Sequence, residues 1–354
     1  MREVLAKWRP VIDEAIEDVL PREIDSEYLV EFFGPPSYGY DIETIQRGLA
    51  DPVWELLDRG GKRWRSILFL KLVEAFGKDP EDFLLYATIP EILHTGTIIV
   101  DDVEDDAELR RGEPALHTQY GTDVALNAGN ALYFIPLKLI NKNPADLSPD
   151  RRLQAYEMLT HELNRTHLGQ GMDIQWHNRR SVDVDESQYL EMCACKTGCL
   201  ARIVARLAAT VTGQSRTVER KIATYAERMS ISFQIIDDVL DIEHTLDQAG
   251  EFGKAFGNDI REGKVTLIML HATEQASPET ASRLQTILHT DTTTEAEILE
   301  AIEIIQETHS VEYSRHRAEE LAQQARAALD DLDLEPEAAG ELAEFTQFMV
   351  DRDV

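Results

Sequence analysis

The chain has 354 residues, a hydrophobic fraction of 43% and a formal net charge of −31. So strong a negative charge argues against nucleic acid and against an anionic membrane surface as partners. The N-terminus lacks the long apolar core of a signal peptide, and no apolar run approaches the roughly 18 residues that span a bilayer, so we expect a cytoplasmic protein without a membrane span.

Hydrophobic periodicity predicts helices along almost the whole chain, with little strand-like alternation. In chain order, the expected helices span residues 1–20, 41–58, 63–76, 79–102, 118–140, 150–178, 186–212 and 217–243, with further helices in 264–354 that break near Pro278, Asp291 and Pro336. Turns are expected at Gly60-Gly61 and Arg110–Pro114, and loops at 33–40 and 244–263.

No short repeat is present and no linker clearly separates two domains. We therefore expect one large all-α domain over residues 1–354, with the motifs in about 41–275 and C-terminal helices in about 276–354. The acids are spread along the whole chain and Arg outnumbers Lys, which predicts a solvated, salt-adapted surface and, as a hypothesis, a halophilic source.

Two aspartate clusters are the main functional signal, Asp101-Asp102-Val103-Glu104-Asp105 and Asp237-Asp238-Val239-Leu240-Asp241. Each has carboxylates at i, i+1 and i+4, and positions i and i+4 share one face of a helix. Asp pairs arise readily in so acidic a chain, but an apolar run leads into each of these two, which predicts that they project from buried helices. Together they could hold several hard cations, and those cations could hold a diphosphate.

Basic residues accompany the clusters. Lys62, Arg63 and Arg65 follow a Gly pair at a helix start, where backbone N–H groups, the helix dipole and the side chains suit a phosphate; the alternative is a helix cap with solvated cations. Arg110-Arg111 follows the first cluster by one loop and could bind phosphate through planar donor sets, or could pair with surface acids.

Further polar groups lie on later helices and in the long loop. Lys196 precedes Thr197 among small and apolar residues and either reaches outward or points into a polar cavity. Lys254 and Lys264 flank Asp259 and either reach a second phosphate site or are simply solvated. Gln170 and Asp173 indicate either a site or a tight helix crossing.

In this order, the motifs resemble those of the class I trans-prenyltransferases, the polyprenyl diphosphate synthase family, and in particular its geranylgeranyl diphosphate synthase-like members. The matching segments are Gly60–Arg65, His94, Asp101–Asp105 with Arg110–Gly112, Gly169-Gln170 with Asp173, Lys196-Thr197, Phe233-Gln234 with Asp237–Asp241, Gly253-Lys254 with Asp259, and Gly263-Lys264. The resemblance covers about residues 60–265 and implies a helical bundle of the isoprenoid synthase type with a central active-site cavity.

The resemblance also implies roles for single residues. Asp101, Asp102 and Asp105 would bind two Mg²⁺ ions, and Asp237, with Asp238 and Asp241, would bind a third. The allylic diphosphate would be held by Arg110, Lys196, Thr197, Gln234, Lys254 and Lys264, and isopentenyl diphosphate by Lys62, Arg65, His94 and Arg111. Asp101, Asp105, Asp237, Arg110 and Lys196 would be the catalytic set, and the family implies a homodimer.

The implied reaction is chain elongation, in which an allylic diphosphate ionises, isopentenyl diphosphate attacks the cation, and a proton is lost. In the family, the residues four and five before the first Asp help to set the pocket floor, and here these are Thr97 and Gly96. Neither is aromatic, so we expect a geranylgeranyl or longer product, and expect Gly96→Phe to shorten it.

Three rival functions remain. A class I terpene cyclase or head-to-head coupling enzyme need not carry the Gly-Gly-Lys-Arg site, and its second metal motif usually differs. A non-catalytic partner subunit would lack Asp or Arg residues of the motifs, and none is missing. A di-iron helical bundle would carry Glu-x-x-His pairs, which are absent at the clusters. The motifs therefore favour chain elongation.

Overall fold

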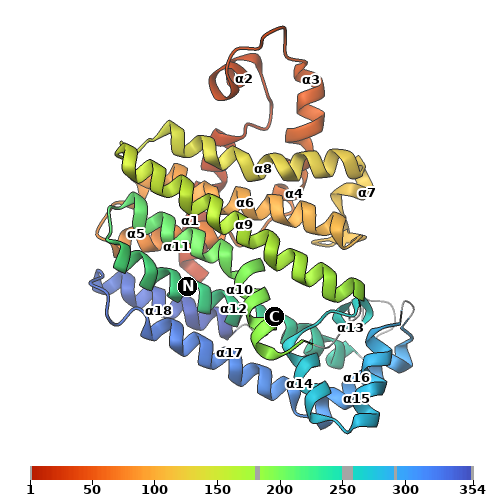
Figure 1. The fold of residues 1–354 in the computed structure, drawn as a ribbon. Helices are drawn as coiled ribbons and strands as arrows, with labels where there is room; N and C mark the ends of the chain where they lie inside the picture. Colours follow the sequence, from red (N-terminus) through yellow and green to blue (C-terminus); the bar gives the residue numbers. More distant parts are fainter. Residues whose placement is uncertain (1, 180–183, 249–257, 291–292, 352–354) are drawn as a thin grey trace. The chain divides into compact units, whose positions relative to one another are not determined.

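The structure, a computed structural model, describes residues 2–179, 184–248, 258–290 and 293–351. These ranges are almost entirely helical, which confirms the all-α prediction (Figure 1). The helices are α1 Arg2–Val19, α2 Ser26–Phe33, α3 Ile42–Ile45, α4 Asp51–Asp58, α5 Trp64–Ala75, α6 Leu84–Glu104, α7 Leu116–Tyr120, α8 Thr122–Lys142, α9 Pro149–Arg179, α10 Glu186–Lys196, α11 Gly198–Val211, α12 Arg216–Gln248, α13 Asn258–Glu262, α14 Leu267–Gln275, α15 Pro278–Leu288, α16 Glu295–Glu307, α17 Ser310–Ala327 and α18 Pro336–Val350.

The described residues also form four short elements. A π-helical turn, Gln46–Ala50, joins α3 to α4, and a 3₁₀ turn, Pro80–Phe83, leads into α6. Strands β1 (Leu109–Arg110) and β2 (Glu113–Pro114) form an antiparallel hairpin. The sequence predicted a turn at this place, and the structure adds the two short strands that fix its geometry.

The chain forms two compact units. The first unit contains Met1–Leu163, Ile203–Arg220 and Asp333–Leu342; the second unit contains Asn164–Arg202, Lys221–Leu332 and Ala343–Val354. Helices α9, α11, α12 and α18 contribute residues to both units. The first aspartate cluster and the Gly-Gly segment lie in the first unit, and the second cluster lies in the second unit.

The first unit is built around α5, α6 and α8. Helix α5 is buried along nearly its whole length, including Arg65 and Lys71. Helices α6 and α8 pack along each other, and each places a glycine at the crossing. A Cβ on Gly96 would come within 2.9 Å of the Gly129 carbonyl oxygen and of the Leu132 Cβ, so only a glycine permits this approach.

The second unit contains two apolar clusters. One joins α10, α12, α14 and α17 and includes Tyr189, Ile235 and Leu267. The other joins α13 to α16 with the end of α12 and includes Val239, Ile268 and Ile302. Helix α10 starts with a capping box, in which Asp185 and Gln188 satisfy each other's backbone N–H groups.

The structure corrects several predicted boundaries. The single helix expected at 186–212 is two helices, α10 and α11, because Thr197 ends α10. Helix α2 lies in a stretch for which no helix was predicted, and α13 lies within the expected loop 244–263, of which 249–257 is outside the described residues. The breaks near Pro278 and Pro336 are confirmed as helix starts; Asp291 is outside the described residues.

The expectation that no apolar run approaches the length of a membrane span needs one correction: among the described residues, the helical stretch Pro80–Glu104 is long and apolar enough to cross a membrane by length and composition alone. Within it, 72% of the most apolar window is buried inside the protein. Core helices of this kind satisfy the same criterion, so the stretch is weak evidence for a membrane span.

Candidate active site

The first aspartate cluster forms the C-terminal end of α6. Asp101 and Asp102 are in its last turn, and Asp105 caps it. The Asp102 side chain is only 2% exposed, and its Oδ1 accepts a hydrogen bond of 2.6 Å from Arg110 Nε. Arg110 also lies 3.8 Å from Asp101. The structure therefore brings the predicted Arg110 onto the predicted carboxylates.

The second carboxylate oxygen of Asp102, Oδ2, is buried. Among the residues that the structure describes, it has no hydrogen-bond partner. Burial raises the pKa of Asp102, while the hydrogen bond from Arg110 opposes that shift. A nearby cation would offset the remaining cost of a buried carboxylate.

The hairpin that carries Arg110 and Arg111 is tied to α4 by Arg59. The Arg59 side chain is 5% exposed, and its Nη1 donates to the carbonyl oxygens of Arg110 (3.1 Å) and Pro114 (2.9 Å). Sequence reasoning missed this residue. Its only sequence signal is its place directly before the Gly pair.

Gly60 and Gly61 both require the conformational freedom of glycine, with φ of 91° and 146°. A Cβ on Gly61 would also meet the guanidinium groups of Arg63 (3.2 Å) and Arg111 (3.4 Å). Arg111 donates to the carbonyl oxygens of Leu56 (3.3 Å) and Gly60. The Gly pair thus leaves room for the side chains of Arg63 and Arg111 to pack closely against the backbone.

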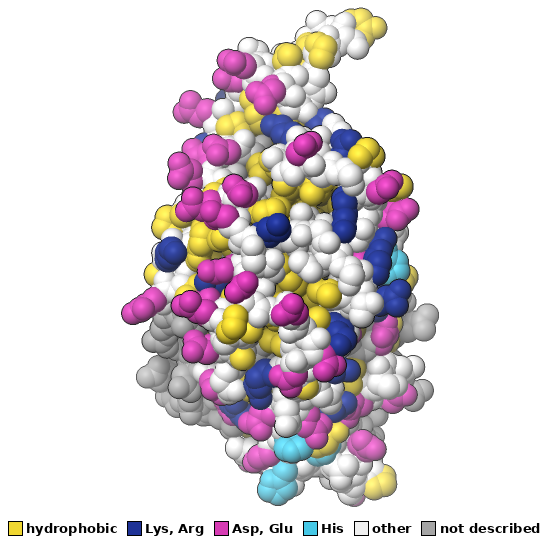
Figure 2. Space-filling model, turned by 90° about the vertical axis from the view of Figure 1, so that its left-hand side faces the viewer, with side chains coloured by type: hydrophobic (Ala, Val, Ile, Leu, Met, Phe, Trp, Pro, Cys, Tyr) yellow, Lys and Arg dark blue, Asp and Glu magenta, His cyan; other side chains and the backbone are white. Residues whose placement is uncertain are grey.

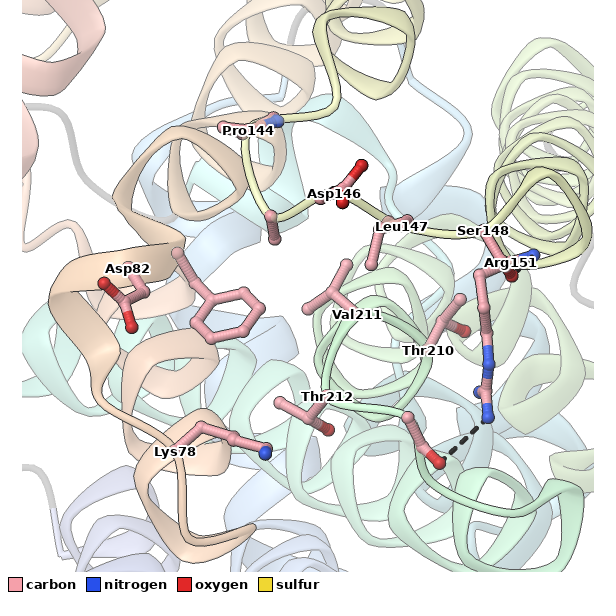
Figure 3. A pocket seen from close by; sticks show the side chains of 13 residues that line it. Lys78, Asp82, Pro144, Asp146, Leu147, Ser148, Arg151, Thr210, Val211 and Thr212 are labelled. Atoms are coloured by element: carbon pink, nitrogen blue, oxygen red, sulfur yellow. Dashed lines mark hydrogen bonds between the residues drawn. The ribbon is translucent and has the colours of Figure 1, made fainter.

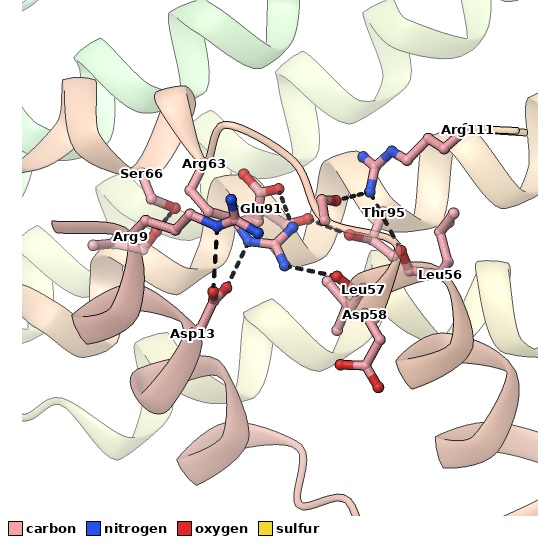
Figure 4. A network of polar contacts seen from close by, with 12 residues as sticks. Arg9, Asp13, Leu56, Leu57, Asp58, Arg63, Ser66, Glu91, Thr95 and Arg111 are labelled. Carbon is pink, nitrogen blue, oxygen red and sulfur yellow. Dashed lines mark hydrogen bonds and ion pairs between the residues drawn. The ribbon is translucent and has the colours of Figure 1, made fainter. Parts of the chain in front are cut away.

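Arg63 belongs to a buried ion-pair network (Figure 4). Its side chain is 3% exposed and contacts Asp13 Oδ1 at 2.7 Å, Glu91 Oε1 at 3.0 Å and the Leu57 carbonyl oxygen at 3.0 Å. Arg63 therefore holds α1, α4, α5 and α6 together.

The two other cations of this segment have different surroundings. Lys62 is exposed, and Arg65 is buried with its guanidinium 4.3 Å from the Trp64 ring centre.

His94 lies seven residues before the first cluster on α6. Burial lowers the pKa of His94 well below its usual value, and Arg65, Arg111 and Arg110 lower it further. The imidazole is therefore neutral near pH 7. Its Nδ1 is buried and has no hydrogen-bond partner within the described ranges of the chain.

Thr97 and Gly96 face different surroundings on α6. Thr97 is half-buried and lies one turn before Asp101, and Thr97 Oγ1 donates to the His94 carbonyl oxygen at 2.8 Å. Gly96 is buried at the crossing with α8. The role of Gly96 in product length stays a prediction, and a larger residue there would first press against α8.

The second cluster lies on α12 and is held by hydrogen bonds within the second unit. Asp238 accepts from the Tyr189 hydroxyl on Oδ2 (2.9 Å) and from Gln234 Nε2 on Oδ1 (3.0 Å). Asp241 Oδ2 accepts from the Asp259 backbone N–H at 3.3 Å. Burial raises the pKa of both Asp238 and Asp259, and the charge of Asp259 raises the pKa of Asp238 further, so a cation near them would be stabilising. Asp237 is half-buried beside them.

The predicted Lys and Thr residues of the second unit also join this network. Thr197 Oγ1 donates to Gln234 Oε1 at 3.2 Å, and Lys196 Nζ lies 2.6 Å from Asp173. Lys264 pairs with Asp259 at 3.3 Å and with Glu262 at 2.7 Å. Lys254 lies outside the described residues.

Gly169 lets α9 approach the end of α10. A Cβ there would lie 2.3 Å from the Lys196 backbone nitrogen, so no larger residue fits. This supports the helix-crossing alternative for the Gly-Gln-Gly segment. The same approach brings Asp173 to Lys196.

Both clusters offer the hard oxygen donors that Mg²⁺ prefers. Across the described ranges, no three His, Cys, Asp or Glu side chains converge closely enough to hold a metal ion by themselves. Mg²⁺ commonly keeps several waters and takes one or two carboxylates plus substrate phosphates, so a sparse donor set fits this ion. The open Oδ2 of Asp102 and the raised pKa of the buried carboxyls fit a cation as well.

A surface hollow of about 660 Å³ in the first unit contains none of the predicted site residues (Figure 3). Phe83 and Val211 line it together with Lys78 and Arg151. Arg151 donates to the carbonyl oxygens of Gly213 (2.9 Å) and Gln214 (3.0 Å) just after α11. Its cation thus stabilises a chain turn, and we assign no ligand to the hollow.

Comparison with known proteins gives consistent matches. The family described as polyprenyl synthetase matches residues 46–305. The geranylgeranyl pyrophosphate synthase of Geoglobus acetivorans is 33% identical over 312 residues, which cover 88% of this chain and 93% of that protein. The geranylfarnesyl diphosphate synthase of Natronomonas pharaonis is 31% identical and covers 98% of this chain and 96% of its own. The crystal structure of geranylgeranyl pyrophosphate synthetase from Pyrococcus horikoshii superposes with a TM-score of 0.84 at 26% identity, over 99% of each chain.

Proposed function

The chain belongs to the polyprenyl synthetase family, and on that premise we propose that it extends an allylic diphosphate with isopentenyl diphosphate to a trans-polyprenyl diphosphate. The family match confirms the resemblance predicted from the motifs and makes the chain a prenyltransferase. Relatives named geranylgeranyl and geranylfarnesyl diphosphate synthases support a product of geranylgeranyl length or longer. The match to the geranylfarnesyl synthase extends over nearly the whole of this chain.

The observation that carries this proposal is the arrangement at the end of α6. There Arg110 is held against Asp102 and beside Asp101, on a hairpin fixed by Arg59. Asp101 and Asp105, supported by Asp102, would hold two Mg²⁺ ions. When bound, these ions neutralise the charge that develops on the departing diphosphate. Arg110 would bind the same diphosphate through its planar donor set.

Isopentenyl diphosphate would be held by Lys62, Arg65, His94 and Arg111. The surroundings of His94 support this role, because the neutral ring can donate one N–H to a phosphate oxygen without being charged itself. Arg63 is part of the buried ion-pair network and would position this segment.

In the second unit, Asp237 with Asp238 and Asp241 would hold a third Mg²⁺. Lys196, Thr197, Gln234, Lys254 and Lys264 would hold the allylic diphosphate. The hydrogen-bonded series from Thr197 through Gln234 to Asp238 supports a joint role for these groups, since each fixes the next. Lys196 would exchange its contact with Asp173 for a phosphate oxygen.

Other expectations also stand as proposals. A homodimer is what membership of the family implies. Phe134 on α8 is apolar and 67% exposed, and it offers a surface that a second subunit could contact. A cytoplasmic location, a single functional domain over 1–354 and a salt-adapted surface follow from the sequence pattern. Sedimentation of the purified protein would test the dimer directly, and a monomer at assay concentration would contradict it.

A matched pair of variants tests the proposed metal site. Asp101→Ala removes a proposed ligand and should lower turnover with isopentenyl diphosphate and an allylic primer by several orders of magnitude, because metal charge stabilisation is lost. Asp106→Asn changes an acid of the same segment whose side chain is fully exposed and should leave turnover nearly unchanged. Equal losses in both, or none in Asp101→Ala, would count against the proposal. Asp237→Ala should lower turnover as much as Asp101→Ala does, while its melting temperature stays close to that of the wild type.

A further inference from the structure

We propose that Tyr189 is a positioning residue for the second aspartate cluster, in that its hydroxyl fixes the Asp238 carboxylate and thereby sets the affinity of the cluster for Mg²⁺. This inference rests on the proposed function and adds to it a residue that no motif includes. Tyr189 precedes Lys196 by seven residues and lies on α10, whereas Asp238 lies on α12.

The geometry at Asp238 carries the proposal. Both carboxylate oxygens accept hydrogen bonds from protein donors, Oδ2 from the Tyr189 hydroxyl at 2.9 Å and Oδ1 from Gln234 Nε2 at 3.0 Å. Asp238 is thus held in one orientation. These two bonds fix the carboxylate that would hold Mg²⁺ together with Asp237 and Asp241.

The Tyr189 ring has little freedom to move. The side chain is 1% exposed and packs in the apolar cluster with Ile235 of α12 and Leu267 of α14. The capping box formed by Asp185 and Gln188 fixes the start of α10 within one turn of the ring. A rigid aromatic ring that presents one hydroxyl to a half-buried carboxylate is well suited to orient it.

The other end of α10 reaches the same carboxylate by a second route. Thr197, which ends α10, donates to Gln234 Oε1, and Gln234 Nε2 donates to Asp238. Because Thr197 holds the Gln234 amide, the amide is oriented to donate to the carboxylate. The two ends of α10 therefore act together on Asp238, and loss of the Tyr189 hydroxyl leaves Oδ2 without its donor.

The test compares two fully buried tyrosines of the second unit. Tyr189→Phe removes the hydroxyl on Asp238, and Tyr225→Phe removes one that accepts from Thr346 instead. Binding of Mg²⁺ in the presence of inorganic diphosphate is measured by calorimetry. We expect Tyr189→Phe to weaken the Mg²⁺ affinity by about tenfold or more, as removal of groups that orient metal ligands commonly does. Tyr225→Phe should bind Mg²⁺ like the wild type.

A double-mutant cycle separates this role from a general loss of packing. If Tyr189 acts through Asp238, the double variant Tyr189→Phe, Asp238→Asn should bind Mg²⁺ no more weakly than Asp238→Asn alone. In turnover assays, Tyr189→Phe should raise the Mg²⁺ concentration needed for half-maximal rate, and the KM for isopentenyl diphosphate should stay close to that of the wild type.

If the wild type elongates, three results would overturn the inference while the proposed function stands. Tyr189→Phe could leave the Mg²⁺ affinity unchanged, or Tyr225→Phe could lower that affinity as much as Tyr189→Phe does. The third result is that the losses of Mg²⁺ affinity from Tyr189→Phe and Asp238→Asn are additive in the cycle. A wild type that neither binds Mg²⁺ with diphosphate nor elongates any primer would overturn the proposed function and this inference with it.

Discussion

Three cations close together in the sequence, Lys62, Arg63 and Arg65, occupy different surroundings. Lys62 is exposed, Arg65 is buried beside Trp64, and Arg63 is buried between Asp13 and Glu91. The pattern of the segment predicted a basic phosphate site. It could not show which cation is structural, because the partners of Arg63 are 50 and 28 residues away in the sequence.

This difference predicts that substitutions of two adjacent residues affect different properties, namely stability at Arg63 and substrate binding at Lys62. Arg63→Met leaves the buried Glu91 without its partner and should lower the free energy of unfolding by about 3–5 kcal/mol. Lys62→Met should leave the unfolding free energy nearly unchanged and raise the KM for isopentenyl diphosphate. Urea denaturation and steady-state kinetics measure the two effects. Comparable destabilisation by both variants would contradict the assignment.

His94 gives a pH dependence with a defined sign. Its pKa is lower in the folded chain than the ordinary value of 6.5, so the unfolded chain binds a proton more readily. The contribution of neutral His94 to stability is therefore present above about pH 6.5 and is lost as the pH falls below that value. The wild type should lose more unfolding free energy between pH 7.5 and 5.5 than His94→Gln does.

The exposed His161 supplies a matched substitution, since His161→Gln makes the same change of side chain at the surface. If His94→Gln and the wild type lose equal unfolding free energy over this pH interval, the assignment of a neutral His94 in the folded chain is wrong.

At the scale of elements, the α6–α8 crossing links the first cluster to the core. A Cβ on Gly129 would meet Val100 Cγ2 at 2.9 Å and Ile99 Cγ2 at 3.2 Å, one and two residues before Asp101. The sequence showed Gly96 near the cluster but not its partner on α8. Such a pairing depends on the crossing of two helices, which hydrophobic periodicity does not specify.

Gly129→Ala should therefore destabilise the protein by about 1–3 kcal/mol through overpacking, and should shift products toward shorter chains as α6 is displaced. The matched control is Gly340→Ala on α18, where a Cβ meets nothing within 4 Å. That change should stabilise the chain by about 0.5–1 kcal/mol, because alanine is the better helix former. Thermal melts and product sizing would test both, and a Gly129→Ala variant as stable as Gly340→Ala would refute the packing argument.

The break at Thr197 shows a second limit of sequence reasoning at this scale. Residues 186–212 read as one amphipathic helix because the apolar positions continue through 197 without a proline. The chain nevertheless ends α10 there, and Gly198 begins α11. The break places Lys196 and Thr197 at a helix end, where their side chains reach Asp173 and Gln234. These contacts join residues 23 and 37 positions apart in the sequence, a separation that local helix propensity does not describe.

At the scale of the whole molecule, composition and periodicity were sufficient for the all-α class, and the ordered motifs were sufficient for the family. What they did not predict are the residues that fix the motifs, such as Arg59, which donates to backbone carbonyl oxygens of the hairpin, and Tyr189, which donates to Asp238 on α12. Such positioning contacts are set by tertiary packing and leave no spacing signal in the sequence.

The charge of the molecule predicts a dependence on salt. Figure 2 shows acidic side chains spread over the visible face, with Lys and Arg side chains among them. At a net charge of −31, repulsion among these acids destabilises the compact state, and salt screens it. The melting temperature should therefore rise steeply with KCl concentration. A protein that is equally stable without salt would contradict the proposal of a salt-adapted surface.

The most direct test of the central claim is a primer assay. The protein is incubated with Mg²⁺, isopentenyl diphosphate and, in separate reactions, allylic primers of increasing length, and the products are sized by chromatography. We predict incorporation of isopentenyl diphosphate, release of inorganic diphosphate and a product of geranylgeranyl length or longer, all abolished by chelation of the metal. Absence of elongation from every primer would contradict this prediction.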